Sequence, residues 1–209
     1  MKKALSLLFL FLLIVTLQSP SEAAGKVRVA RTPIILNGAM MPDAATIDRL
    51  DTLLDRELNV PLNGVLGIVE YIPEAEATDA LNSVITENQA LLGYKFHYRD
   101  VIRAAAQKVE ADVFVIPVIT DYYEVITFGG WYWDTGRGLH TSTGLKLVVY
   151  DGRADRVYEK EGNRYYNSSY SLWGTAANLI VDCMYIAIDE AKIYEIINPT
   201  DKLTDMVDK

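Results

Sequence analysis

An aromatic cluster set among glycines is the group of side chains best suited to binding. The segment FGGWYWDTGRG (residues 128–138) places Phe128, Trp131, Tyr132 and Trp133 among four glycines. Aromatic rings combine a large apolar face with a polar edge, which suits a partly wet contact with a protein, a glycan or a lipid headgroup. The glycines allow backbone torsions that other residues avoid. Two interpretations are open: an exposed contact patch, or a hairpin loop whose rings fold back on a sheet.

Further tyrosines lie in the two strand-like stretches on either side of this cluster. Tyr122 and Tyr123 precede it, and Tyr165 and Tyr166 follow it. If the two stretches are neighbouring strands, their rings form one continuous surface. The alternative is ordinary cross-strand aromatic pairing, which contributes roughly 0.2–1 kcal/mol per pair. The candidate binding residues are therefore Phe128, Trp131, Tyr132, Trp133, Tyr122 and Tyr166.

Side chains that catalyse reactions or bind metals are sparse. His97 and His140 are the two histidines, and neither has a second ligand at the short spacing typical of zinc sites. His140 with Asp134 and the hydroxyl of Ser142 or Thr141 is the one combination suited to acid–base work, but no strained nucleophile turn surrounds it. The glycines also lack the Lys-Ser/Thr ending of a phosphate-binding loop. We therefore expect no catalytic residue, metal or cofactor, with a hydrolase at Asp134 and His140 as a minor alternative.

The single cysteine, Cys183, lies in an apolar stretch between Ile180 and Ala187. One cysteine cannot form an internal disulfide. A thiol in apolar surroundings has little thiolate character, so we predict a buried and unreactive side chain.

The first residues have the pattern of a secretory signal. Lys2 and Lys3 are followed by an apolar stretch (residues 4–17) and by small residues ending at Ala23, where a signal peptidase would cleave. The stretch is shorter than the roughly 20 residues of a spanning helix, which disfavours the alternative of a retained anchor. No cysteine lies near Ala23 to carry a lipid. We expect an exported, periplasmic or envelope-associated protein without a lipid anchor.

Composition limits the remaining classes of function. Half of the residues are apolar, enough for the packed core of one ordinary domain. The net charge is -8, and removing Lys2, Lys3 and Glu22 makes it -9. An acidic chain without a basic run is a poor nucleic-acid binder. The expected organisation is a signal peptide, one domain and a flexible tail, at residues 1–23, 24–198 and 199–209.

The periodicity of apolar residues predicts an α/β (α+β) fold with helices packed on a mixed sheet. Runs of β-branched and apolar residues predict strands at 26–36, 65–71, 111–128 and, as two strands about the turn at Asp151-Gly152, within 143–167. Apolar stripes at spacings of three and four predict helices after Asp43, after Pro73, over 98–110 and over 171–196. The predicted order is β-α-β-α-α-β-β-β-β-α, with the count of elements uncertain by one.

Two details of the strands carry structural expectations. Pro117 lies inside the run 111–128, and a proline there predicts an edge strand or a bulge. In the run 145–150, the apolar Leu145, Leu147 and Val149 alternate with a second set that includes Lys146 and Tyr150. This alternation predicts a strand with one face in solvent.

The chain resembles a group of bacterial envelope domains in two short motifs. Ala111-Asp112 stands before a strand, and Val149-Tyr150-Asp151-Gly152 leads into a turn. The group includes the curli-secretion lipoprotein, the outer-membrane lipoprotein activators of peptidoglycan synthases, and the N-terminal domain of the Tol-system β-propeller protein. The resemblance implies an α/β sandwich that serves as an assembly or interaction module without enzymatic activity.

Taken with the sparse chemistry, these features predict an exported, non-enzymatic interaction or assembly module of the bacterial cell envelope. Its expected partner is an envelope protein or a second copy of the chain. The alternative is a carbohydrate- or lipid-binding protein that uses Trp131, Tyr132 and Trp133 as its contact loop.

Overall fold

A six-stranded mixed sheet forms the centre of the computed structural model, which describes residues 26–38, 40–92, 97–128, 137–168 and 173–198. The strands are β1 (Val27–Arg31), β2 (Ile35–Leu36), β3 (Val69–Tyr71), β4 (Val113–Phe128), β5 (Arg137–Asp151) and β6 (Arg156–Ser168). Their order is β3-β1-β4-β5-β6, with β2 paired to β4. β1 pairs in parallel with β3 and β4, whereas β4, β5 and β6 form an antiparallel meander. The predicted mixed sheet in a single α/β domain is confirmed.

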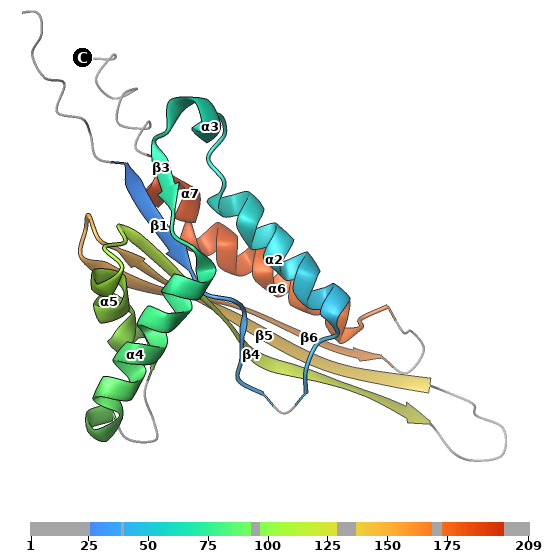
Figure 1. Ribbon diagram of the computed structural model, residues 1–209. Helices are drawn as coiled ribbons and strands as arrows, with labels where there is room; N and C mark the ends of the chain where they lie inside the picture. The colour runs from blue at the N-terminus through green and yellow to red at the C-terminus, as the bar shows by residue number, and fades with distance from the viewer. Residues whose placement is uncertain (1–25, 39, 93–96, 129–136, 169–172, 199–209) are drawn as a thin grey trace, which may run out of the picture.

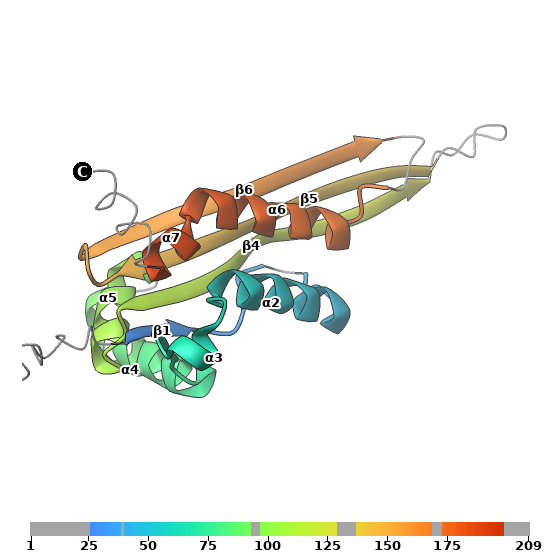
Figure 2. The same cartoon turned by 90° about the horizontal axis from the view of Figure 1, so that it is seen from above.

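Helices cover the sheet on both faces (Figures 1 and 2). They are α2 (Ala44–Leu58), α3 (Asn63–Leu66), α4 (Glu74–Leu92), α5 (Tyr98–Lys108), α6 (Ala176–Ala191) and α7 (Ile193–Ile197). Residues of α2, α6 and α7 share one core cluster with the sheet, and residues of α4 and α5 share the other. We call the two sides the α6 face and the α5 face. In the described part of the chain, no helix has the length and apolar character needed to cross a membrane.

The central strand β4 is buried on both faces in its first half. Val113 and Val115 belong to the core under α6, and Phe114 and Ile116 to the core under α5. A strand covered on both sides has no solvent-facing positions, which explains its continuous apolar sequence.

The expectation that the strand at 145–150 has one face in solvent is wrong. Leu147 and Val149 pack in the core of the α6 face, as their spacing suggested. Val148 and Tyr150, however, are buried in the core of the α5 face. The helices α4 and α5 therefore close this half of the sheet on the side that was expected to be open.

The second half of β4, the first half of β5 and the second half of β6 extend past α4 and α5 (Figures 1 and 2). A change of register between Ile119 and Asp121 marks the point where β4 leaves the covered region. Such a bulge adds a residue to one strand and reverses which later residues point to each face. Here the α6 face stays covered, because the fully buried Cys183 of α6 lies against Thr143 of β5.

Pro117 lies neither on an edge strand nor in the bulge. It pairs with Leu147 across β4 and β5 in the interior of the sheet. On its other side, β1 pairs with β4 only at Val113–Val115 and β2 only at Val118 and Ile119. Proline is tolerated because the position falls between the two short partner strands, where its missing N–H is not required.

Three predicted elements have different bounds. The strand expected at 65–71 is shortened to β3, because residues 63–66 form α3 between the left-handed residues Leu62 and Gly67. The strand expected at 26–36 is split into β1 and β2, and the strand expected to begin at residue 143 begins at Arg137 as β5.

The long helix expected at 171–196 ends at Ala191 and resumes as α7, because Lys192 between them has a left-handed φ of 49°. The helix expected at 98–110 is confirmed as α5. The expected signal peptide (1–23) and the tail (199–209) lie outside the described residues.

Candidate interaction surface

Most of the predicted aromatic cluster falls outside the described residues. Trp131, Tyr132 and Trp133 belong to residues 129–136, which link the end of β4 to the start of β5. Phe128 is the last residue of β4, and its backbone pairs with Arg137. The exposed-patch and folded-back interpretations of the cluster both stay predictions.

The condition for a continuous tyrosine surface is not met, because β5 separates β4 from β6. Tyr122 pairs with Thr143 on one side of β5, and Tyr166 pairs with Thr141 on the other. Tyr122 is partly buried against the core of the α6 face, and this burial raises the pKa of its phenol, with Asp43 as the next contribution. Tyr122 is therefore a packing residue of the α6 face.

Tyr166 packs against the chain that leads into α6. A Cβ atom at Gly174 would collide with the Tyr166 ring at Cγ, Cδ1 and Cδ2. The ring thus lies directly on the glycine backbone, and no larger residue fits between them. Tyr166 fixes the approach of the helix to the sheet.

In this extension the exposed tyrosines are the neighbouring residues, Tyr123 and Tyr165. They flank Ser142 in one row across β4, β5 and β6, and the two residues are 45% and 69% exposed. Strands two positions apart are roughly 9.5 Å apart, so the two tyrosines stand on either side of the smaller Ser142.

Polar groups surround this pair on the same face. Ser142 donates a short hydrogen bond to Asp121 Oδ2, and His140 lies one row further along, between Val125 and Asn167. We call the α5-face residues of this extension the open strip: Asp121, Tyr123, Val125, Thr127, His140, Ser142, Asn163, Tyr165 and Asn167. It combines aromatic contact area with hydrogen-bonding groups on a surface that neither α4 nor α5 covers.

The hydrolase alternative does not gain a catalytic geometry from the described residues. Thr141 is fully buried on the opposite face from Ser142, so it cannot share a site with it. Among the described residues no hydrogen bond joins His140 to Ser142, whose hydroxyl is held by Asp121. Asp134 lies outside the described residues. In the same part of the chain, no group of His, Cys, Asp and Glu side chains is arranged to hold a metal ion.

Cys183 is fully buried, as predicted. Its thiol lies 3.4 Å from Thr143 Oγ1, and burial raises the pKa of the thiol. A thiol with a raised pKa is mostly protonated at neutral pH and is a poor nucleophile.

Glu124 connects the extension to α6. Its Oε2 accepts a 2.6 Å hydrogen bond from the Ala176 N–H, whereas the N-cap residue Thr175 makes no side-chain cap. A carboxylate at a helix N-terminus satisfies a free N–H and complements the helix dipole. We therefore expect Glu124→Ala to lower the free energy of unfolding by about 1–2 kcal/mol.

The matched control for this prediction is Glu124→Gln, which keeps an acceptor oxygen and loses only the charge. In urea unfolding, the wild type should be the most stable, Glu124→Gln less stable, and Glu124→Ala the least stable. Equal stabilities for Ala and wild type would show that the bond contributes nothing to holding α6.

Sequence reasoning chose Tyr122 where Tyr123 is exposed, and it did not include Asp121 or Asn163. The reason is the bulge after Ile119, which reverses the alternation of β4 at this point. Alternation counted from the buried Val118 would place Tyr122, not Tyr123, on the α5 face. The pattern of the apolar residues carries no separate signal for this reversal.

No family model and no curated protein matches the chain. Solved structures similar to it include a lipoprotein of Neisseria meningitidis, at 15% identity and TM-score 0.35, covering 78% of this chain and 99% of that one. PelC of Paraburkholderia phytofirmans, crystallised as a dodecamer, has 13% identity and TM-score 0.38, covering 81% and 90%. The LpoB C-terminal domain of Salmonella enterica has 14% identity and TM-score 0.31, covering 71% and 89%.

A lipoprotein and LpoB, a peptidoglycan-synthase activator, are thus among the similar structures, as the sequence motifs led us to expect. With TM-scores below 0.5, these likenesses contribute nothing to the argument for function.

Proposed function

We propose that this chain is a non-enzymatic interaction module of the bacterial cell envelope that binds a partner protein through the open strip. The observation that carries the proposal is the pair Tyr123 and Tyr165, exposed side by side across Ser142 on a sheet face without a helix. Exposed aromatic residues are enriched at protein interfaces because they bury much area and lose little conformational entropy. The segment with Trp131 and Trp133 continues from the same strands and is the proposed end of the contact.

Export and the absence of catalysis are parts of the same proposal. The signal-like first residues support export. The acid–base groups of the extension, His140 and Ser142, lie on an open surface and are not joined in a relay. A surface of this kind supplies binding area and lacks the enclosed, dry site that catalysis uses.

Photo-crosslinking in the envelope tests the partner contact. A benzoyl-phenylalanine at position 165 should form an adduct with one partner protein, or with a second copy of the chain. The additional change Tyr123→Ser should reduce that adduct about fivefold, since losing one aromatic contact costs on the order of 1 kcal/mol.

The matched control places the same crosslinker at Tyr185, an exposed tyrosine of α6 on the other face. Equal adducts from positions 165 and 185 would contradict a specific contact at the open strip. Reproducible turnover of an envelope substrate that His140→Ala abolishes would contradict the non-enzymatic part.

Binding of a glycan or a lipid is the second candidate, favoured by the exposed aromatic side chains of Tyr123 and Tyr165 on either side of Ser142. Aromatic faces of this kind are able to stack on a sugar ring. Tryptophan fluorescence, to which Trp131, Trp133 and Trp173 contribute, should then shift when peptidoglycan fragments or vesicles are added. A flat titration, or unchanged binding by the variant Tyr123→Ser with Tyr165→Ser, would exclude this pair as a glycan site.

A further inference from the structure

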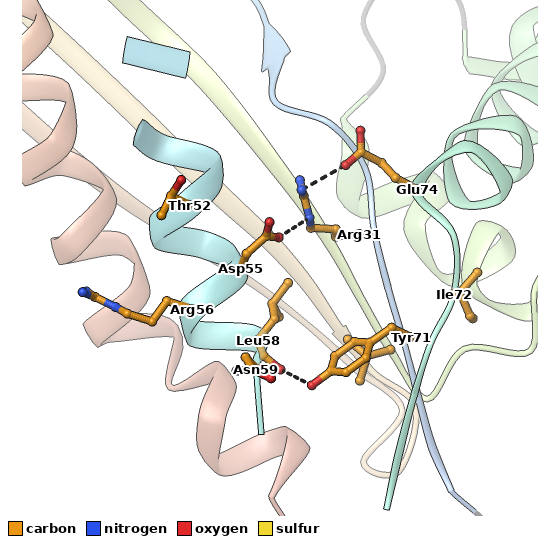
Figure 3. Close-up of a pocket in the computed structure, with 10 residues that line it drawn as sticks. Arg31, Thr52, Asp55, Arg56, Leu58, Asn59, Tyr71, Ile72 and Glu74 are labelled. Carbon is orange, nitrogen blue, oxygen red and sulfur yellow. Dashed lines mark hydrogen bonds and ion pairs between the residues drawn. The ribbon is translucent and has the colours of Figure 1, made fainter. Parts of the chain in front are cut away.

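A groove lies away from the open strip, between α2, the paired strands β1 and β3, and the start of α4 (Figure 3). Its volume is about 670 Å³, within the range of sites that bind small ligands or inserted side chains. One wall is charged and the other is mainly apolar. This division decides what kind of ligand fits.

The charged wall is built around Arg31 and its carboxylate partners. Arg31, only 17% exposed, contacts Asp51 at 3.0 Å, Asp55 at 2.8 Å and Glu74 at 3.0 Å. One guanidinium opposite three carboxylates gives this cluster a formal charge of -2; Asp55 and Glu74 line the groove, whereas Asp51 does not. Arg56 also lines the groove, but Figure 3 shows its side chain pointing away from Arg31.

Two of these carboxylates are accessible to a ligand. The side chains of Asp55 and Glu74 are 58% and 42% exposed and stand on either side of Arg31 in Figure 3. Each contacts Arg31 through one oxygen, Oδ1 of Asp55 and Oε2 of Glu74. The second oxygen of each remains an acceptor for a cation that enters between α2 and α4.

The apolar wall is held rigidly. The Tyr71 hydroxyl donates to the Leu58 carbonyl at 3.0 Å and accepts from the Val60 N–H at 3.0 Å. These bonds fix the partly exposed ring beside Leu58 and Ile72 along the groove. A hydrocarbon chain can therefore lie on a preformed surface.

Asp51, which does not line the groove, responds mainly to its burial. Burial raises the pKa of Asp51 above its usual value, although the charge of Arg31 acts in the opposite direction; Asp55 and Asp48 raise it further. A second cation near this cluster would relieve the repulsion among the carboxylates.

We infer that the groove binds a lysine side chain from an extended peptide of a partner protein, with its ammonium group between Asp55 and Glu74. The four-carbon stem would lie on Tyr71 and Leu58. A compact ammonium with three donors suits two separate carboxylate oxygens, whereas Arg31 already provides the planar fork of a guanidinium. The site is remote from the open strip and does not depend on the proposed function.

A peptide titration followed by NMR tests the inference. Acetyl-Leu-Lys-Leu-amide, added to the ¹⁵N-labelled protein, should shift the amide signals of Asp55, Tyr71 and Glu74. The same peptide with Gln in place of Lys should bind about fivefold more weakly, because it lacks the ion pairs. Equal Kd values for the two peptides, or shifts confined to other parts of the protein, would overturn the site.

Variants separate the groove from general attraction to an acidic protein. Glu74→Gln and Asp55→Asn should each weaken the Lys peptide severalfold, since each removes one acceptor charge. Glu76→Gln, two residues along in α4 and outside the groove lining, is the matched control and should leave Kd unchanged. An equal effect of Glu76→Gln would overturn the inference. If one groove variant unfolds, the Kd values of the Lys and Gln peptides for the wild-type protein still test the inference.

Discussion

Gly162→Ala should destabilise the protein by about 3 kcal/mol, because an added methyl group has no space there. Gly162 lies in β6 opposite Leu145, on the face that α6 covers. A Cβ atom would lie 2.8 Å from both the carbonyl carbon and the Cα of Cys183 and would collide with its carbonyl oxygen. All three atoms belong to the helix backbone, so no side-chain rotation relieves the clash. The helix itself has to move away from the sheet.

Thermal or urea unfolding measures this effect. A loss of about 3 kcal/mol corresponds to a fall in Tm of roughly 6–12 °C for a domain of this size. Gly64→Ala is the matched control, since no atom lies within 4 Å of the position of its Cβ. If Gly162→Ala unfolds at the same temperature or urea concentration as Gly64→Ala and the wild type, then α6 does not pack on β6 as closely as the structure shows.

The same displacement should expose the buried thiol. Cys183 reacts slowly with a thiol reagent while it is enclosed between α6 and Thr143. We expect faster modification in Gly162→Ala than in Gly64→Ala, measured under native conditions. Equal reaction rates would mean that the helix accommodates the methyl group without lifting.

The sheet itself was largely predictable from sequence because burial on both faces leaves a clear pattern. Residues 113–119 of β4 are all apolar, and all of them except Pro117 belong to one of the two cores. The helix at Tyr98–Lys108 follows equally from Val101, Ile102 and Ala105, which recur at helical spacing and are buried. Local periodicity is sufficient where an element contacts the core along its whole length.

Contacts between distant parts of the chain decide the features that sequence did not reveal. The split between α6 and α7 depends on the left-handed backbone at Lys192, which no glycine marks. The edge of β3 is closed by Asn63, whose side-chain amide bonds both the N–H and the C=O of Val69. Neither arrangement leaves a periodic pattern in the sequence, because each depends on the conformation or the hydrogen bonds of a single residue.

The candidate surface also combines features that the sequence indicated with features that it did not. Composition drew attention to the tyrosines of β4 and β6, but after the bulge it is Tyr123, not Tyr122, that lies exposed on the α5 face. The groove at Arg31 had no signal at all, since its acids come from separate helices. Asp51 and Asp55 lie on α2, and Glu74 begins α4. These carboxylates meet only when the helices pack around β1.

Arg31→Met should lower the stability by about 2 kcal/mol near neutral pH and by much less near pH 4. The substitution keeps most of the aliphatic volume but leaves Asp51, Asp55 and Glu74 without their shared cation. The estimate stays below that for a fully buried ion pair because Asp55 and Glu74 are partly solvated.

The pH dependence has a definite sign. The pKa of Asp51 is already raised in the folded protein by burial, so the folded state binds this proton more tightly than the unfolded state. Stability from this group is therefore greatest below its usual pKa of 3.8 and falls as the pH rises through the raised value. Losing Arg31 removes the influence that lowers this pKa, so the penalty near neutral pH increases. Protonation of Asp51 at low pH removes its share of this penalty.

Urea unfolding of Arg31→Met and wild type near pH 7 and near pH 4 measures the difference directly. Arg99→Met is the control, because Arg99 is 58% exposed and lies 3.9 Å from Glu159, a surface pair expected to contribute less than about 1 kcal/mol. A loss in Arg31→Met that is equal at both pH values would assign the effect to packing of the aliphatic chain. A loss that disappears at low pH identifies uncompensated carboxylates, the same excess charge that the lysine peptide requires.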